Sequence, residues 1–181
     1  MSITVVKIES SYKNTITSLL KELVGFNNKV IEKDNYTIIE HNYENIDDIK
    51  SLILSFSSEQ MINVFCYQTI TYNYNEEYNL VKNALNNYKN GFYTLKDLLI
   101  NDDLNNHKKE ILSLILSGSG ITEDFIIEYL KYDLNLSKAA KEMFIHRNTM
   151  IYKLDKLKEL TGFDLRCFKD SYILYNLIIN K

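Results

Sequence analysis

The chain has 181 residues, no proline and a formal net charge of −3, with 45% hydrophobic and 25% charged residues. This length suits one compact domain or two small ones, and the apolar fraction is large enough to form a core, which excludes global disorder. The isoelectric point of about 5.7 speaks against a basic surface over the whole chain, but nucleic-acid binding depends on where Lys and Arg cluster.

The sequence carries no sign of export, of a membrane segment or of a disulfide framework. Cys66 and Cys167 lie far apart and lack metal-ligand spacing. The first residues lack the basic and apolar regions of a secretory signal, and the apolar runs fall short of the roughly 18 residues that a membrane span requires. We therefore expect a soluble cytoplasmic protein without a membrane partner.

The first hundred residues alternate between strand and helix patterns. β-branched or alternating runs predict strands at 3–8, 30–31, 36–39 and 61–72, and helical spacing of apolar residues predicts helices at 10–23, 47–56 and 76–88. Asp34 and Asn35 are residue types that favour a hairpin turn. The order β-α-β-β-α-β predicts a ferredoxin-like sandwich, with one antiparallel sheet and helices on one face.

Beyond Leu104 the pattern is helical only. Gly118, Ser119 and Gly120 interrupt it, and Thr122 is placed to cap the next helix, with Ile121 packing against Ile126. The predicted fold class is therefore α+β. We assign residues 1–104 to an α+β dimerisation or signal-sensing domain and residues 105–181 to an all-α domain.

No motif in the sequence indicates a catalytic site, a cofactor site or a metal site. The three histidines are scattered, no His-Glu-x-x-His pair occurs, and no glycine-rich loop of the phosphate-binding type is present. A Ser-x-x-Lys pattern at Ser10 and Lys13 lacks its companion motifs. Cofactor-binding, metal-binding and catalytic residues are therefore expected to be absent.

Acidic, cysteine and histidine side chains that could take part in catalysis are also expected to have structural or solvent-exposed positions instead. The acidic pairs 47–48 and 76–77 each begin a predicted helix, where they complement the helix dipole, so we expect solvated side chains. Cys66 alternates with Val64 and is expected in the core of its strand. His41 ends a strand and is expected to be exposed.

The segment 134–155 has the pattern of two short crossing helices. Ser137 is predicted to cap the first helix, Ala139 and Ala140 are small enough for a close crossing, and Met143 is predicted to point inward. A turn through residues 144–146 follows.

The second helix is predicted to begin near Arg147 and to pack through Met150, Leu154 and Leu157. Seven of its polar or aromatic side chains are left for solvent: His146, Arg147, Asn148, Thr149, Tyr152, Lys153 and Lys156. Arg pairs with guanine or phosphate, Asn with adenine, and Thr, Tyr and Lys with phosphate or the thymine methyl group. The pattern fits a DNA recognition helix, but it also fits an ordinary amphipathic pair with a polar outer face.

Beyond this pattern, the segment resembles the C-terminal helix-turn-helix of the PucR/CdaR-type bacterial transcription regulators. The matching residues are Asn135-Leu136-Ser137, Ala140, Phe144 to Thr149, Tyr152, Leu154 and Leu160 to Leu165. The resemblance implies that Arg147, Asn148 and Thr149 enter the major groove, and that Ser137 and Lys138 help to hold the DNA backbone. Ile151 stands where the family more often has Arg, which implies one basic contact fewer.

The N-terminal half resembles the degenerate GGDEF-like domain that precedes this helix-turn-helix in the family. The resemblance lies in residues 75–99, with Gly91-Phe92-Tyr93 before Leu95 and Asp97-Leu98-Leu99. The paired glycines and acidic residues of a cyclase are missing, so cyclic-nucleotide synthesis is not expected.

The leading hypothesis is a sequence-specific transcription regulator that binds double-stranded DNA as a homodimer, with an unknown small molecule as a possible effector. The alternative is a protein-interaction adaptor that no longer binds DNA and uses Ile151 and Tyr152 as a partner surface. Local charge favours DNA: residues 134–169 carry eight basic and four acidic side chains, a charge of +4. The acidic excess of the chain lies in its first hundred residues, with nine basic and twelve acidic side chains.

Overall fold

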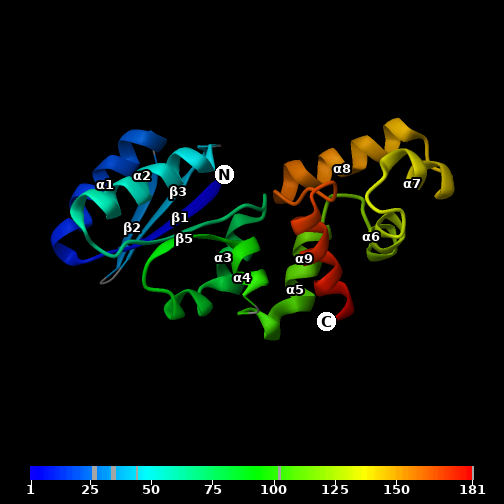
Figure 1. The fold of residues 1–181 in the computed structure, drawn as a ribbon. Helices are drawn as coiled ribbons and strands as arrows, with labels where there is room; N and C mark the ends of the chain where they lie inside the picture. Colours follow the sequence, from blue (N-terminus) through cyan, green and yellow to red (C-terminus); the bar gives the residue numbers. More distant parts are fainter. Residues whose placement is uncertain (26–27, 34–35, 44, 102, 181) are drawn as a thin grey trace. The chain divides into compact units, whose positions relative to one another are not determined.

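A computed structural model describes residues 1–25, 28–33, 36–43, 45–101 and 103–180. Contacts divide the chain into two compact units, Met1–Leu98 and Leu99–Lys181. Helix α4 (Leu95–Ile100) contains the boundary between them. The N-terminal unit mixes strands and helices and the described part of the C-terminal unit is helical (Figure 1), as the α+β fold class predicted.

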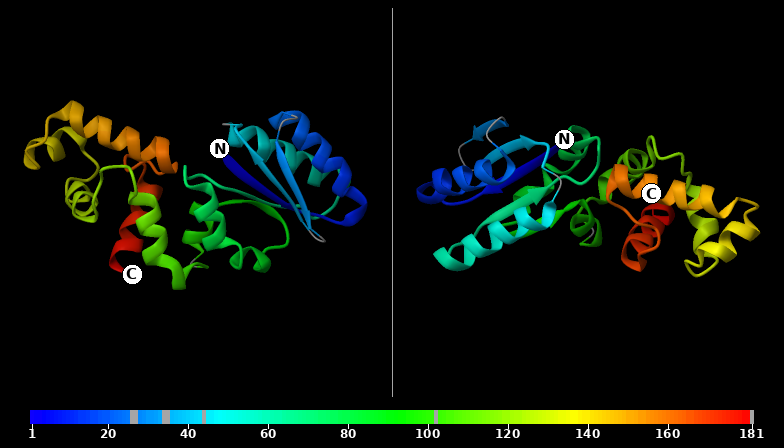
Figure 2. Two further views of the ribbon diagram at one scale, coloured as in Figure 1. Left: turned by 180° about the vertical axis from the view of Figure 1, so that it is seen from behind. Right: turned by 90° about the horizontal axis from the view of Figure 1, so that it is seen from above.

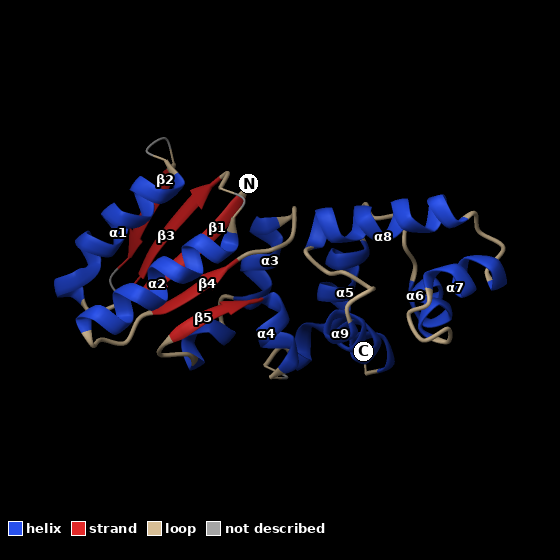
Figure 3. Cartoon of the chain, turned by 45° about the horizontal axis from the view of Figure 1, so that its top comes forward, coloured by secondary structure: helices blue, strands red, loops and turns tan. Residues whose placement is uncertain are grey.

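The N-terminal unit is built on a five-stranded sheet in the order β2-β3-β1-β4-β5 (Figure 3). The strands are β1 (Ser2–Lys7), β2 (Lys29–Lys33), β3 (Tyr36–His41), β4 (Phe65–Gln68) and β5 (Gly91–Thr94). The first four strands pair antiparallel, with Val5 opposite Ile38 and Tyr67. The predicted pairing of the two hairpin strands is confirmed, while its turn at Asp34 and Asn35 lies outside the described residues.

Helices cover both faces of this sheet, so the predicted single helical face is wrong. Helices α1 (Ser10–Val24) and α2 (Ile46–Gln60) lie over one face (Figure 3), where Val6, Ile39 and Cys66 of the strands belong to one core cluster with residues of both helices. Helix α3 (Tyr74–Val81) packs on β1 and bonds to Tyr67, whose side chain alternates with that of Cys66. The crossover after β4 is what brings a helix to the second face.

The sheet also differs from the prediction in its last strands. β4 is four residues long rather than the predicted 61–72, because Met61 ends α2 in the left-handed conformation with φ 52°. The predicted helix 76–88 ends at Val81 and continues as a 3-10 turn at Ala84–Asn87. β5 was not predicted and pairs parallel with β4, so the sheet is mixed rather than wholly antiparallel.

The N-terminal unit buries a hydrogen-bonded polar cluster at His41, which was predicted to be exposed and is only 1% exposed. Its Nδ1 accepts the Tyr43 N–H at 3.1 Å, so Nε2 carries the ring proton and lies 2.7 Å from Thr4 Oγ1. Thr4 in turn donates to the side-chain oxygen of Gln68. Burial lowers the pKa of His41, which keeps the imidazole neutral.

Glu77 is a second buried polar group, and its predicted solvated position is wrong. The side chain is fully buried and accepts hydrogen bonds from Tyr67 Oη at 2.6 Å and from the Thr71 and Ile70 N–H groups at 2.7 and 3.0 Å. Burial raises the pKa of Glu77, and these hydrogen bonds act in the opposite direction. The carboxyl group therefore holds the chain after β4 in place. The other pair, Asp47–Asp48, is exposed as predicted.

The C-terminal unit contains a helical bundle. Its helices are α5 (Lys108–Leu116), α6 (Glu123–Leu130), α7 (Leu136–Glu142), α8 (Arg147–Thr161) and α9 (Phe168–Ile179), with a 3-10 turn at Asn105–His107 before α5. Helices α5 and α9 pack side by side and α8 lies across their ends (Figures 1 and 2). None of the helices in the described ranges combines the length and apolarity that a membrane span requires.

The predicted break between α5 and α6 is confirmed. Gly118 and Gly120 both have positive φ, 71° and 72°. The Thr122 hydroxyl caps α6 by accepting the Phe125 N–H at 3.2 Å. Ile121 and Ile126 on either side of this cap are both buried. The predicted glycine break and the Thr122 cap are therefore confirmed, and both isoleucines are in the core.

Candidate nucleic-acid interface

The N-cap of helix α7 lies two residues before the predicted cap. The Asn135 side chain accepts the Lys138 N–H at 3.0 Å, so Asn135 is the N-cap and the predicted capping role of Ser137 is wrong. Asn and Ser cap helices equally well, and Asn135 precedes the first helical residue whereas Ser137 already lies inside the helix. The Ser137 hydroxyl is therefore left for another contact.

The inner surface of the helix pair matches the prediction closely. Ala139 and Ala140 of α7 are 0% and 4% exposed, and α7 packs on α8. Met150, Leu154 and Leu157 of α8 are each 0% exposed. Small residues at a crossing allow two helices to approach closely. Met143, which was predicted to point inward, is only partly buried.

A tight reversal joins α7 to α8. Phe144 has φ 53°, its N–H bonds to the Lys141 carbonyl at 3.2 Å, and the Ile145 N–H bonds to the Ala140 carbonyl at 2.9 Å. These two bonds around a left-handed residue form a Schellman motif, which ends a helix while satisfying its last carbonyls. Phe144 is 96% exposed. The predicted turn is thus confirmed as a closed helix end.

His146 starts the second helix. Its Nδ1 accepts the Asn148 N–H at 3.2 Å, so the imidazole is the N-cap of α8. Arg147, Asn148 and Thr149 follow in the first helical turn, and all three are exposed. The cap satisfies an otherwise unbonded amide, so these three side chains are presented from a well-ordered helix start.

Arg147 is oriented by the preceding helix. Its Nε donates to Ser137 Oγ at 3.3 Å. This bond uses one of the guanidinium donors and leaves the two terminal nitrogens outside it. A guanidinium held in this way presents paired N–H groups, which match the O6 and N7 acceptors of guanine.

Lys153 lies in a different environment from the other predicted contacts. Its ammonium donates to the Gly120 carbonyl at 2.6 Å and lies 5.8 Å from the centre of the Phe125 ring. The side chain therefore ties α8 to the loop before α6. Its predicted contact with a DNA phosphate stays a prediction.

The remaining predicted side chains differ in exposure. Lys138 is exposed, with its ammonium 5.9 Å from the Tyr132 ring centre, and Tyr152 is 64% exposed. Lys156 and Ile151 are partly buried. The structure thus brings Ser137 and Arg147 together, while Lys153 is directed to α6.

A network of ion pairs supports the end of α8. Asp164 accepts from Arg166 Nε at 2.7 Å and lies 3.2 Å from Lys158 Nζ, and Arg166 also contacts Asp155 at 2.8 Å. Burial alone would raise the pKa of Asp164, but the hydrogen bonds from Arg166 and Lys158 outweigh it and lower the pKa to about 2. Two of the eight basic residues of segment 134–169 are therefore bound to acidic neighbours.

The end of α8 and the segment after it contain several residues with structural roles. Thr161 Oγ1 accepts the Phe163 N–H at 3.2 Å, and Gly162 adopts the left-handed conformation with φ 73°. Phe163 and Leu165 are both 0% exposed. Sequence reasoning recognised this segment only as part of a motif, because no local pattern signals its bonds to α9, from Ser171 Oγ to the Leu165 carbonyl at 2.6 Å and from the Asp164 N–H to Asp170 at 2.8 Å.

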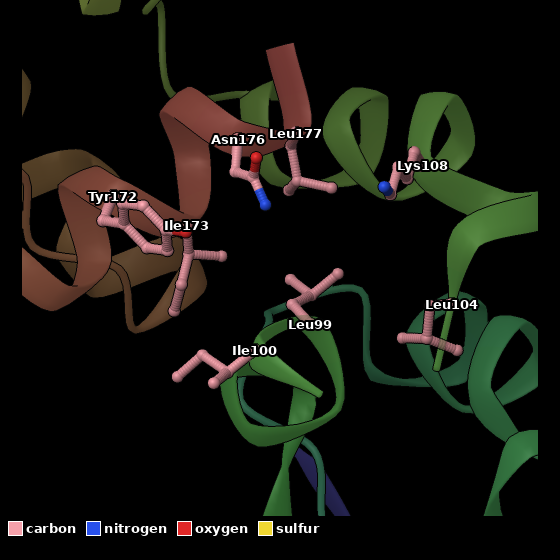
Figure 4. Close-up of a pocket in the computed structure, with 8 residues that line it drawn as sticks. All are labelled: Leu99, Ile100, Leu104, Lys108, Tyr172, Ile173, Asn176 and Leu177. Carbon is pink, nitrogen blue, oxygen red and sulfur yellow. The ribbon is translucent and has the colours of Figure 1, made fainter. Parts of the chain in front are cut away.

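The C-terminal unit contains a small cavity between the middle of α9 and the segment 99–108. A cavity of about 40 Å³ is lined by Leu99, Ile100, Leu104, Lys108, Tyr172, Ile173, Asn176 and Leu177 (Figure 4). A space of this size holds only a few water molecules. Across the described ranges, no group of three or more His, Cys, Asp or Glu side chains is placed to hold a metal ion.

Two short helices crossing at small residues, with an exposed polar helix start, define a helix-turn-helix domain. Its particular type follows from the family comparison, because residues 124–176 match the PucR C-terminal helix-turn-helix domain. The recognition of this domain is therefore confirmed. The degenerate GGDEF-like identity of the N-terminal unit is outside the matched region.

Curated relatives match the same part of the chain. The carbohydrate diacid regulator of Escherichia coli (strain K12) is 33% identical over 60 residues, which cover 33% of this chain and 16% of the relative. The purine catabolism regulatory protein of Bacillus subtilis (strain 168) is 45% identical over 38 residues, 21% of this chain and 7% of the relative. The matched stretches are thus a small part of either regulator.

A solved structure matches over a longer stretch but weakly. The regulator of polyketide synthase expression from Bifidobacterium adolescentis is 17% identical with a TM-score of 0.44, and the match covers 99% of this chain and 78% of that chain. Similarity at this level assigns neither a fold nor a function to the N-terminal unit.

Proposed function

We propose that this chain is a sequence-specific DNA-binding transcription regulator that inserts the start of α8 into the major groove. One observation carries the proposal: Arg147, Asn148 and Thr149 are exposed together on a helix start whose opposite face is fully buried. A recognition helix needs this arrangement, since its first turn contacts base edges while its inner face is held by the domain.

Each side chain has a role that follows from its chemistry. Arg147, oriented by Ser137, pairs with guanine, and Asn148 pairs with adenine. Thr149 contacts a thymine methyl group or a phosphate. Lys138, Tyr152, Lys156 and the His146 ring contact phosphates, whereas Lys153 is held by the Gly120 carbonyl. The phosphate contacts position the domain, and Arg147 and Asn148 supply the sequence preference.

The proposal extends to the whole chain. The regulator acts in the cytoplasm as a homodimer, and it carries no catalytic activity or cofactor. The N-terminal unit is a degenerate GGDEF-like domain for dimerisation or for sensing an unidentified small molecule. What supports this role is its mixed five-stranded sheet and the missing cyclase glycines and acids in residues 75–99.

The test is fluorescence anisotropy with duplex DNA selected from a randomised pool by the full chain. Arg147→Ala is expected to cost about 1–3 kcal/mol of binding and to relax the base preference, because it removes a bidentate contact. Arg147→Lys is the matched control, since it keeps the charge but not the planar pair of donors. Full recovery by lysine would limit Arg147 to a phosphate contact, and an unchanged affinity of the alanine variant would refute the recognition helix.

Salt dependence separates the regulator from a protein-interaction adaptor. If three basic side chains of one domain each neutralise a phosphate, raising salt from about 50 to 200 mM lowers its affinity about 40-fold. An adaptor surface around Ile151 and Tyr152 predicts no salt-sensitive retention on DNA even at low ionic strength. That result would replace the regulator proposal with the adaptor.

A further inference from the structure

Helix α9 presents an apolar face that the domain itself does not cover. Its exposed apolar side chains are Phe168 (77%), Tyr172 (55%), Tyr175 (42%) and Ile179 (54%), which we call the α9 seam. Their spacing of four, three and four residues is that of a helix that packs lengthwise on another helix. Of the two charged residues of α9, Asp170 is buried and Lys169 is exposed at the first turn. A helix facing only water normally carries a charged outer face.

The α9 seam contains both a ridge and a groove. The rings of Phe168 and Tyr172 stack with centroids 6.4 Å apart and planes 24° apart, which forms the ridge. A groove of about 420 Å³ lies beside it, lined by Leu130, Asp133, Leu134, Phe168, Ser171, Tyr172 and Tyr175. A two-fold symmetric interface requires a surface that complements itself, so that the ridge of each copy enters the groove of the other.

The seam lies apart from the proposed DNA contacts. Helix α9 packs on α5 and α6, whereas Arg147 is held by α7 at the start of α8. A partner on α9 therefore leaves the start of α8 free for DNA. The α9 seam is therefore a second surface of the domain, separate from the proposed DNA-binding surface at the start of α8.

We propose that the α9 seam is the docking surface for a second copy of this chain, with the two α9 helices antiparallel about a two-fold axis. The four exposed side chains that define the α9 seam are uncharged and cause no repulsion between two copies, and the groove beside them is lined by one charged residue, Asp133. The antiparallel arrangement places each Lys169 beside the carboxyl-terminal turn of the other α9, where the helix dipole favours a cation. The inference rests on the proposed function in one respect. A local charge of +4 is small for one DNA-binding domain, so firm binding requires two copies that act together.

Photo-crosslinking of the full chain tests the occupant directly. Replacing Tyr175 with p-benzoyl-phenylalanine keeps an aromatic ring in the seam and makes it photoreactive. Irradiation is expected to give a product of twice the chain mass, joined to α9 or to residues 130–134 of the other copy. A crosslink to residues 1–98 of the same chain, or no crosslink at high protein concentration, would overturn the proposal.

Sedimentation equilibrium measures the energetic contribution of the seam. Tyr175→Lys is expected to raise the dimer dissociation constant at least about tenfold, since it places two like charges in an apolar contact. Met61→Lys is the matched control, because Met61 is 93% exposed in the N-terminal unit and gains the same charge. Circular dichroism verifies that both variants are folded. Equal dissociation constants for Tyr175→Lys and Met61→Lys would contradict the proposal.

Failure of the seam and failure of the proposed function give different results. If the seam is wrong, Arg147-dependent DNA binding persists while the crosslink between copies is missing. If DNA binding is wrong, the crosslink forms while Arg147→Ala leaves retention on duplex DNA unchanged.

Discussion

Two groups of polar side chains, one in each unit of this chain, lie in opposite environments. In the N-terminal unit His41 and Glu77 are buried, and their hydrogen bonds go to neighbouring strands and loops. In the C-terminal unit Arg147, Asn148 and Thr149 are exposed at a helix start. A buried group with its donors and acceptors already bonded stabilises the fold, whereas an exposed group retains donors for a partner. A shifted pKa alone therefore does not identify the candidate site of this protein, because the shifted pKa values of His41 and Glu77 belong to buried structural groups.

The largest expected effect comes from removing the buried carboxyl group. Glu77→Ala leaves the Ile70 and Thr71 amides and the Tyr67 hydroxyl without their acceptor. We expect a loss of about 3–5 kcal/mol in the free energy of unfolding, measured by urea denaturation. The neighbouring Glu76→Ala is the control: Glu76 is exposed, so a change within about 0.5 kcal/mol is expected. Similar losses for both variants would refute the structural role of Glu77.

Acid should weaken the two units in different pH ranges. The folded pKa of His41 is lowered, so the unfolded chain binds the proton first, and stability falls as pH drops below about 6.5, by up to about 1.4 kcal/mol per pH unit. Asp164 has a folded pKa of about 2, so its contribution is present above about pH 4 and is lost as pH falls towards 2.

Urea denaturation across pH, with peptide-resolved hydrogen exchange to assign each transition, measures these two ranges. The difference between the natural chain and His41→Gln isolates the imidazole, because the raised pKa of Glu77 acts in the opposite direction in both proteins. A C-terminal unit that loses stability first between pH 6.5 and 4 would contradict the comparison.

A smaller effect distinguishes two lysines on α8. Lys153→Ala removes the bond to the Gly120 carbonyl and the contact with the Phe125 ring, so we expect a loss of about 1 kcal/mol in stability. Lys156→Ala should leave stability nearly unchanged and lower the salt slope of DNA binding by about one. If Lys153→Ala instead keeps stability and lowers the salt slope, the sequence-based phosphate contact is correct.

The reaction rates of the two cysteines compare the two units without any mutation that changes stability. Cys167 is exposed and should react with a thiol reagent at once, whereas Cys66 is fully buried and should react only when the N-terminal unit opens. Burial also raises the pKa of the Cys66 thiol, which disfavours the reactive thiolate. Glu77→Ala should accelerate Cys66 alone. Equal rates for both thiols in the natural chain would refute the buried position.

Local patterns predicted the helical unit better than the sheet. Met150, Leu154 and Leu157 follow one helical periodicity, so their burial was predictable from a single window of sequence. The start of α7 was misplaced by two residues because Asn135 and Ser137 carry the same capping signal. Asn148 and Thr149 lie on the polar side of that same periodicity, whereas Arg147 shares the spacing of Met150 and Leu154 and is exposed because it stands at the helix start.

The sheet contains features that no local window reveals. β5 is four residues long and begins at Gly91, so its identity as a strand depends on its parallel pairing with β4. The burial of Glu77 depends on the loop after β4 folding over the first turn of α3, where an acidic residue would otherwise suit the helix dipole. β5 pairs with a strand far away in the sequence, and Glu77 bonds to residues six to ten positions away, so neither feature follows from a single helix or strand pattern.

The close crossing of α7 and α8 has a consequence for genetics. Ala139 and Ala140 leave no room for a larger side chain, so Ala140→Val must tilt α8 or cost about 1–3 kcal/mol of overpacking. Loss-of-function mutations should therefore fall into two groups that give the same result in a reporter screen. One group changes the side chains proposed to contact DNA, and the other changes the angle of α8. Protein abundance in the cell distinguishes the two groups, because only the variants with altered packing are destabilised and therefore degraded by proteases.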